Sequence, residues 1–215
     1  MRNKLLLCVL GILTVCLTAA GQEPTEPGSP PETRVGVGIS FEPMKIFPAG
    51  NMMVTALTPV NIHIPLSVGG TVTIEPEFGI YSYSDESSSA GYTTTQSYSL
   101  TRLGAGVLVT VAGDQSARLY VGPRVGFFFW KEKQEIAPAP YPGYTGGETS
   151  ETDVTIAGCV GGEYSIVKHM SVGGEALVTY FILGDPDETP APTTPTEYSR
   201  SLIMTNVLFI VRWYF

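Results

Sequence analysis

Histidine and cysteine, the side chains that most often bind metals or act in catalysis, are scarce in this chain. Its 215 residues include two histidines, His63 and His169, and three cysteines. Cys8 and Cys16 fall in an apolar leader, which leaves Cys159 in the body of the chain. The two histidines and Cys159 lie too far apart in sequence for the usual spacing of metal ligands. We therefore predict no catalytic residue, no metal site and no cofactor, and we assign His63 to a polar interior.

Charged side chains, in contrast, follow a period of two. In each segment that alternates as a strand does, one face is apolar and the charges fall on the opposite face. These charges are Arg34, Glu42, Glu75, Glu77, Arg102, Arg118, Arg124, Asp153, Glu163, Glu175 and Arg212. A charge that faces lipid near the middle of a bilayer costs about 2–4 kcal/mol. This alternation therefore favours a barrel with its apolar face toward lipid and its charged face toward the interior. A soluble barrel would have charges outside and apolar residues inside.

Nine of these residues make up a predicted interior charge network. They are Arg34, Glu75, Glu77, Arg102, Arg118, Arg124, Glu163, Glu175 and Arg212. The lumen of an eight-stranded barrel is only wide enough for side chains to fill it, and buried charges are tolerated when they are paired. We therefore expect a closed, salt-bridged interior, concentrated in the half of the barrel that carries the short turns.

Eight segments have the length and alternation of membrane-crossing strands. They are residues 34–42, a segment ending at 60–64, residues 72–80, 102–111, 118–130, 153–165 and 172–181, and a last segment ending at Phe215. Long connections at 43–51, 84–97, 131–152 and 184–198 alternate with short ones at 65–70, 113–116 and 167–170. This alternation places all long loops at one end. The sequence predicts an all-β, eight-stranded antiparallel up-and-down transmembrane β-barrel.

The last strand has the clearest pattern. Val207, Phe209, Val211, Trp213 and Phe215 share one face, which is entirely apolar. Taken by itself, this pattern also fits the buried last strand of a secreted β-sandwich, which is the alternative to a membrane-crossing strand. In a bilayer the same face contacts lipid, and its aromatic residues lie at the interface.

The pattern of the amino-terminal residues predicts a secretory signal peptide. Arg2 and Lys4 precede an apolar run of 13 residues, and residues 18–20 form a small-residue cleavage site. We assign residues 1–20 to a signal peptide, 21–32 to a disordered Pro-rich spacer and 33–215 to the barrel. Removal of the leader leaves 10 basic and 20 acidic residues, a net charge of −10. This acidic balance excludes nucleic acid as a partner.

Across residues 33–215 the chain resembles the small eight-stranded outer-membrane barrels of the outer-membrane protein A and X type. The features that carry the resemblance are the signal peptide, the loop rhythm, residues 74–79, Gly173-Gly174-Glu175 and the terminal Arg212-Trp213-Tyr214-Phe215. The resemblance implies a location in the bacterial outer membrane of a Gram-negative cell, in contact with lipid, as a monomer. It also implies that Phe209, Val211, Trp213 and Phe215 form an assembly signal that the barrel-assembly machinery reads.

Two classes of function remain open at this point. The first is a non-enzymatic surface protein whose loops contact a host surface, a polysaccharide or another protein, or serve envelope structure alone. In the loops, Tyr92, Tyr98, Tyr141, Tyr144 and Tyr198 offer aromatic contacts. The second class is a small-solute channel or, less favoured, a lipid-acting enzyme.

Overall fold

A computed structural model gives the fold. It describes residues 33–42, 45–49, 52–56, 60–89, 91–114, 116–138, 146–189 and 200–215. The predicted signal peptide and spacer, and Tyr141, Tyr144 and Tyr198, lie outside these residues. Among the described residues, no helix is long and apolar enough to cross a membrane.

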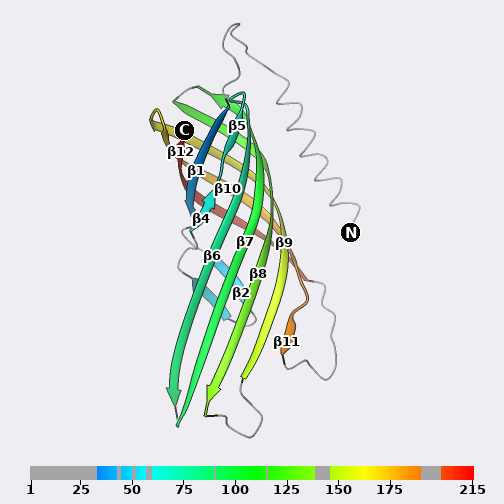
Figure 1. Cartoon of the computed structure of the whole chain (residues 1–215). Helices are drawn as coiled ribbons and strands as arrows, with labels where there is room; N and C mark the ends of the chain where they lie inside the picture. The colour runs from blue at the N-terminus through cyan, green and yellow to red at the C-terminus, as the bar shows by residue number, and fades with distance from the viewer. Residues whose placement is uncertain are drawn as a thin grey trace.

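The described chain is built from strands (Figure 1). Their bounds are β1 Arg34–Phe41, β2 Lys45–Ala49, β3 Met52–Ala56, β4 Asn61–His63, β5 Leu66–Val68, β6 Val72–Ser89, β7 Tyr92–Gly113, β8 Ala117–Ala137, β9 Gly146–Val167, β10 Met170–Leu183, β11 Asp187–Thr189 and β12 Arg200–Tyr214. Strands β2 and β3 form a separate two-stranded sheet, in a region where the sequence predicts a connection.

The main sheet closes on itself. Strand β1 pairs with β12 on one side and with β4 and β5 on the other, and β9 pairs with β10 to complete the ring. Strands β4 and β5 together occupy one position of the ring. They are separated because Pro65 between them has no N–H to donate to the ladder. Every pairing is antiparallel. The predicted eight-stranded up-and-down barrel is confirmed.

Short turns connect the strands at one end of the barrel. Gly69 and Gly70 both have positive φ, 64° and 69°, and turn the chain between β5 and β6. Between β7 and β8, Asp114 Oδ1 accepts hydrogen bonds from Ser116 N, Ser116 Oγ and Ala117 N at 2.7–3.0 Å. These donors lower the pKa of the Asp114 carboxyl. The predicted short turns lie at this end.

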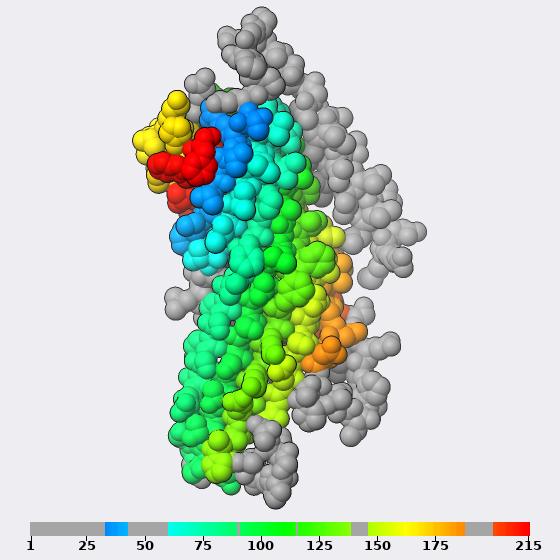
Figure 2. Space-filling view, viewed as in Figure 1, coloured from blue at the N-terminus to red at the C-terminus, as the bar shows by residue number. Residues whose placement is uncertain are grey.

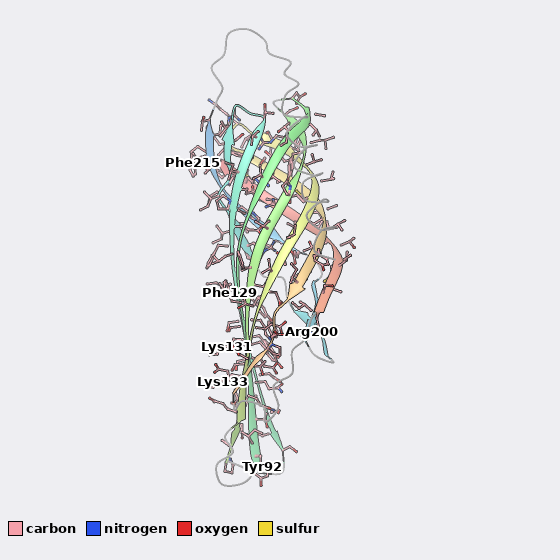
Figure 3. All side chains as sticks on the ribbon, turned by 90° about the vertical axis from the view of Figure 1, so that its right-hand side faces the viewer. Tyr92, Phe129, Lys131, Lys133, Arg200 and Phe215 are labelled. Carbon is pink, nitrogen blue, oxygen red and sulfur yellow. The ribbon has the colours of Figure 1, made fainter. Side chains whose placement is uncertain are left out.

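A belt of apolar side chains covers the outside of the barrel. Val37, Ile39, Ile74 and Phe127 are among many large apolar residues with more than 40% of their surface exposed, while Arg124, Glu75 and Arg212 are buried inside. Water would disfavour such a surface, and a bilayer favours it. The belt ends where outward residues become polar, as Phe129 gives way to Lys131 along β8 (Figure 3).

Four strands continue well past the apolar belt. Residues 82–89 of β6, 92–99 of β7, 130–137 of β8 and 146–152 of β9 form what we name the protruding sheet (Figures 1 and 2). About eight residues per strand extend it by roughly 25 Å, at the usual rise of a strand. Strand β11 pairs with β9 along residues 148–150.

The protruding sheet corrects the predicted loops at 84–97 and 131–152. Their richness in Ser, Thr and charged residues favours loops, yet most of these residues pair in register. Hydroxyls bond across the strands, Ser84 to Ser97 at 3.2 Å and Ser88 to Thr93 at 3.1 Å. Because both faces of this sheet meet water, neither face is apolar, and the usual alternation is absent. The predicted loop at 184–198 contains β11, and its residues 190–198 lie outside the described residues.

Candidate functional site

Two arginines and two glutamates form the centre of the barrel interior. Arg124 Nη2 lies 2.6 Å from Glu75 Oε1 and 2.7 Å from Glu175 Oε1. Arg212 donates to the same carboxylates, from Nε to Glu75 Oε2 at 2.7 Å and from Nη2 to Glu175 Oε1 at 3.2 Å. All four side chains are at most 2% exposed. Charges at this depth are stabilised when each has several partners, as here.

The network continues toward the short turns through Glu163. This carboxylate accepts from Arg212 Nη1 at 2.7 Å and lies 2.7 Å from Arg118 Nη2. Two tyrosine hydroxyls also belong to the network. Tyr214 donates to Glu163 at 3.2 Å, and Tyr120 donates to Glu175 Oε1 at 2.9 Å. Neither tyrosine is among the nine residues of the predicted network. Each tyrosine lies two residues from an inward arginine on the same strand, and this spacing is the sequence signal that indicates an inward side chain.

On the opposite side of the centre, the network reaches the half of the barrel next to the protruding sheet. Arg102 Nη2 lies 2.6 Å from Glu77 Oε1, and its Nη1 lies 3.5 Å from Glu42 Oε1. His63, fully buried, places Nδ1 3.3 Å from Glu75 Oε1 and Nε2 2.7 Å from Ser40 Oγ. The charges therefore occupy more than the half of the barrel that was predicted.

Glycines make room for these long side chains. A Cβ at Gly161 would lie 2.5 Å from the Tyr120 ring and 2.7 Å from Glu175 Cγ. A Cβ at Gly106 would lie 2.9 Å from Arg124 Nη1. The inward glycines thus let arginines cross a lumen that larger residues would fill.

Other predicted residues lie apart from this cluster. Arg34 is exposed at the start of β1, which corrects its assignment to the interior. Cys159 is buried and faces inward, with 4% exposure. His169 is exposed in the turn before β10, where Nδ1 lies 3.1 Å from the carbonyl oxygen of Tyr214.

The residues of the predicted assembly signal point outward. Phe209, Trp213 and Phe215 are 57%, 46% and 76% exposed, and Val211 is half-buried beside them. Phe215 lies at the end of the barrel opposite the protruding sheet (Figure 3). The structure places these side chains on the lipid-facing surface, and their part in assembly stays a prediction.

Small cavities lie within the network. One, of about 20 Å³, is lined by Glu77, Arg102, Arg124 and Asn206, and another, of about 10 Å³, lies beside Tyr120 and Arg212. Cavities of this size hold about one water each. Within the described parts of the chain, no three His, Cys, Asp or Glu side chains are grouped to hold a metal ion.

A second, smaller cluster lies at the mouth of the barrel beside the protruding sheet. Arg200 Nη2 donates to Glu151 Oε1 at 3.1 Å and to the Gly184 carbonyl at 3.4 Å, while Gly184 N donates to Asp153 Oδ1 at 3.0 Å. These bonds join β9 to both ends of the connection between β10 and β12. Partial burial and the adjacent Asp153 carboxylate raise the pKa of Glu151 to about 7.

The two faces of the protruding sheet differ. The inner face continues the inward side of the barrel and carries Tyr83, Tyr98 and Trp130, whose neighbouring ring centroids lie 6.3 and 5.8 Å apart. The outer face carries Lys131 and Lys133, paired with Glu148 at 2.8 Å and with Glu135 at 2.5 Å.

Comparison with solved structures supports this description. A major outer membrane protein from Thermus thermophilus has a TM-score of 0.52 and 9% identity over 85% of this chain and 99% of that one. Ail, the attachment invasion locus protein of Yersinia pestis, solved with the heparin analogue sucrose octasulfate, has a TM-score of 0.51 and 12% identity over 86% and 99%. This chain has the fold of a small outer-membrane β-barrel. No protein-family model and no curated protein matches it. At these identities the likeness establishes the fold alone.

The outer-membrane barrel accounts for the arrangement of the chain. Its closed ring satisfies the backbone within lipid, its apolar belt faces the acyl chains and its charges face inward. The predicted location in the bacterial outer membrane is confirmed.

Proposed function

We propose that the protein is a non-enzymatic outer-membrane anchor that displays the protruding sheet for contact with other surfaces. The observation that carries the proposal is the continuity of the sheet with the barrel: β6, β7, β8 and β9 pass from the belt into the sheet without a break. Contacts on such a sheet are fixed by the barrel beneath it, which lowers the entropy lost on binding.

The interior supports the non-conducting part of this proposal. Side chains from β6, β8, β10 and β12 meet at the centre and hold one another by charge-assisted hydrogen bonds. A lumen of eight strands leaves little space beside them. The alternative of a small-solute channel requires these bonds to open.

A cell-binding assay tests the proposal. Residues 82–99 and 131–152 are replaced by short turns, and cells with either protein are applied to immobilised host-cell matrix, polysaccharide and purified proteins. We expect the full protein to bind one of these surfaces and the shortened protein to lose that binding, with equal amounts of folded barrel in the membrane. Equal binding by both would place the contact outside the protruding sheet and overturn the proposal.

Planar-bilayer recording tests the closed interior. Refolded protein is expected to give no reproducible conductance step, because the paired arginines and glutamates fill the lumen. Steady steps from the unmutated protein would replace the anchor with a small-solute channel.

A further inference from the structure

The protruding sheet has an asymmetric distribution of charge. Its outer face has two lysines, Lys131 and Lys133, and each forms a salt bridge with a glutamate. The inner face carries the alternate residues of the same strands. Its charged residues are Asp85, Glu132 and Glu151, and none of its strand residues is a lysine or arginine. The inner face is therefore acidic, while most charge on the outer face is neutralised locally.

Two of the inner carboxylates have no cationic partner within the described part of the chain. Among the residues that the structure describes, neither Asp85 nor Glu132 forms a salt bridge, whereas Glu151 pairs with Arg200. Tyr98 pairs with Glu132 across β7 and β8, so its hydroxyl lies near one of these carboxylates. Burial, followed by the Glu132 carboxylate, raises the pKa of Tyr98.

Aromatic rings lie among these carboxylates. Tyr83 pairs with Tyr98 across β6 and β7, and Tyr98 pairs with Glu132 across β7 and β8. Tyr83 is 46% exposed, and Tyr92, near the tip of the sheet, is 40% exposed (Figure 3). Carboxylates next to exposed tyrosine rings and the half-buried Trp130 ring suit a cation, which gains from both the charge and the ring.

The spacing of the carboxylates indicates the form of the ligand. Glu132 and Asp85 lie in successive cross-strand rows, with Asp85 two residues further from the membrane, whereas Glu151, one row nearer the membrane than Glu132, is already paired with Arg200. Rows of a sheet are about 7 Å apart, which is also the separation of alternate side chains in an extended polypeptide. An extended chain that runs along β7, between Asp85 on β6 and Glu132 on β8, with a basic residue at every second position can therefore place one cation at each row.

We propose that the inner face of the protruding sheet, through Asp85 and Glu132 with Tyr83, Tyr98 and Trp130, binds a lysine- or arginine-rich extended polypeptide segment. This inference rests on the proposed function, because it names the class of partner for the displayed sheet. Sulfated and phosphorylated polymers are disfavoured, since they would meet like charge on this face.

A binding titration with the full chain tests the inference. The protein is refolded in micelles of an uncharged detergent, and a fluorescent heptapeptide of alternating lysine and serine is added. We expect saturable binding that weakens as salt rises, because screening acts on exposed charges. A peptide of alternating glutamate and serine, and neutral dextran, are expected not to bind.

Variants locate the site. Asp85→Asn with Glu132→Gln is expected to weaken binding by up to about fivefold for each charge removed. Glu135→Gln with Glu148→Gln changes the net charge equally on the outer face and is expected to leave binding unchanged. Equal losses in the two double variants would overturn the inference, because they would show attraction to net charge alone.

The rings have their own test. Tyr83→Leu with Tyr98→Leu is expected to weaken binding, and Tyr83→Phe with Tyr98→Phe to retain it, because phenylalanine keeps the ring. All variants are compared at equal heat resistance of the folded band on gels, which excludes misfolded protein. Binding of dextran in place of the lysine peptide would overturn the cationic partner. If no probe binds while cells still adhere through the sheet, this inference fails and the proposed function stands.

Discussion

Arg212 and Glu75 are bonded across the barrel although they are 137 positions apart in sequence. Arg212 donates to Glu75 from Nε at 2.7 Å and from Nη2 at 3.0 Å, and both side chains are at most 2% exposed. The same carboxylate also accepts from Arg124 at 2.6 Å. One glutamate on β6 thus holds the last strand and β8 together from inside.

Removal of this shared carboxylate is expected to destabilise the barrel strongly. Glu75→Gln leaves Arg124 and Arg212 short of negative charge in a buried site, and we expect the free energy of unfolding to fall by about 3–5 kcal/mol. Urea titration of the heat-resistant band measures the change. The control is Glu135→Gln, because its exposed pair with Lys133 is screened by water and is expected to contribute little. Similar midpoints for the two variants would contradict a central role for Glu75.

A single methyl group tests the packing of the interior. Gly161→Ala would bring its Cβ to 2.5 Å from the Tyr120 ring, and we expect about 1–3 kcal/mol of destabilisation from the displaced ring. Gly158→Ala, on the same strand, meets no atom within 4 Å and serves as the matched control. An unaltered unfolding midpoint in Gly161→Ala would mean that Tyr120 and Glu175 have room to move.

Glu151 is expected to make stability depend on pH. Its pKa of about 7 in the folded protein lies above its ordinary value of 4.5. The proton is therefore held more tightly in the folded state, and the stabilisation is complete below about 4.5 and lost as pH rises through about 7. We expect the urea midpoint to fall between pH 5 and pH 8, and Glu151→Gln to reduce that fall. A slope that the substitution leaves unchanged would assign the effect to other groups.

The terminal aromatic residue is expected to matter for insertion more than the spacer does. Phe215 is 76% exposed on the lipid-facing side, where an assembly factor could contact it as part of an added strand edge. Deletion of Phe215 should lower the yield of barrel in the outer membrane far more than truncation of residues 21–32. Immunoblots of membrane fractions provide the measurement, and equal yields would count against an assembly signal at this end.

The sequence by itself determined the barrel. Lipid outside and a filled lumen inside require opposite chemistry on alternate residues, so the positions of Glu75, Arg124 and Arg212 in a period of two already fixed which way each side chain points. The turns were equally readable, because Gly69-Gly70 and Asp114 have local conformational preferences that need no partner strand.

The partners of the inward charges were decided by tertiary structure alone. Parity states that Arg212 faces inward, but the stagger of the closed ring brings it to Glu75, Glu163 and Glu175 and leaves Arg34 exposed at the rim. The protruding sheet depended on tertiary structure for a related reason. With water on both faces, residues 82–99 need no apolar side, so only their pairing with neighbouring strands distinguishes them from a loop.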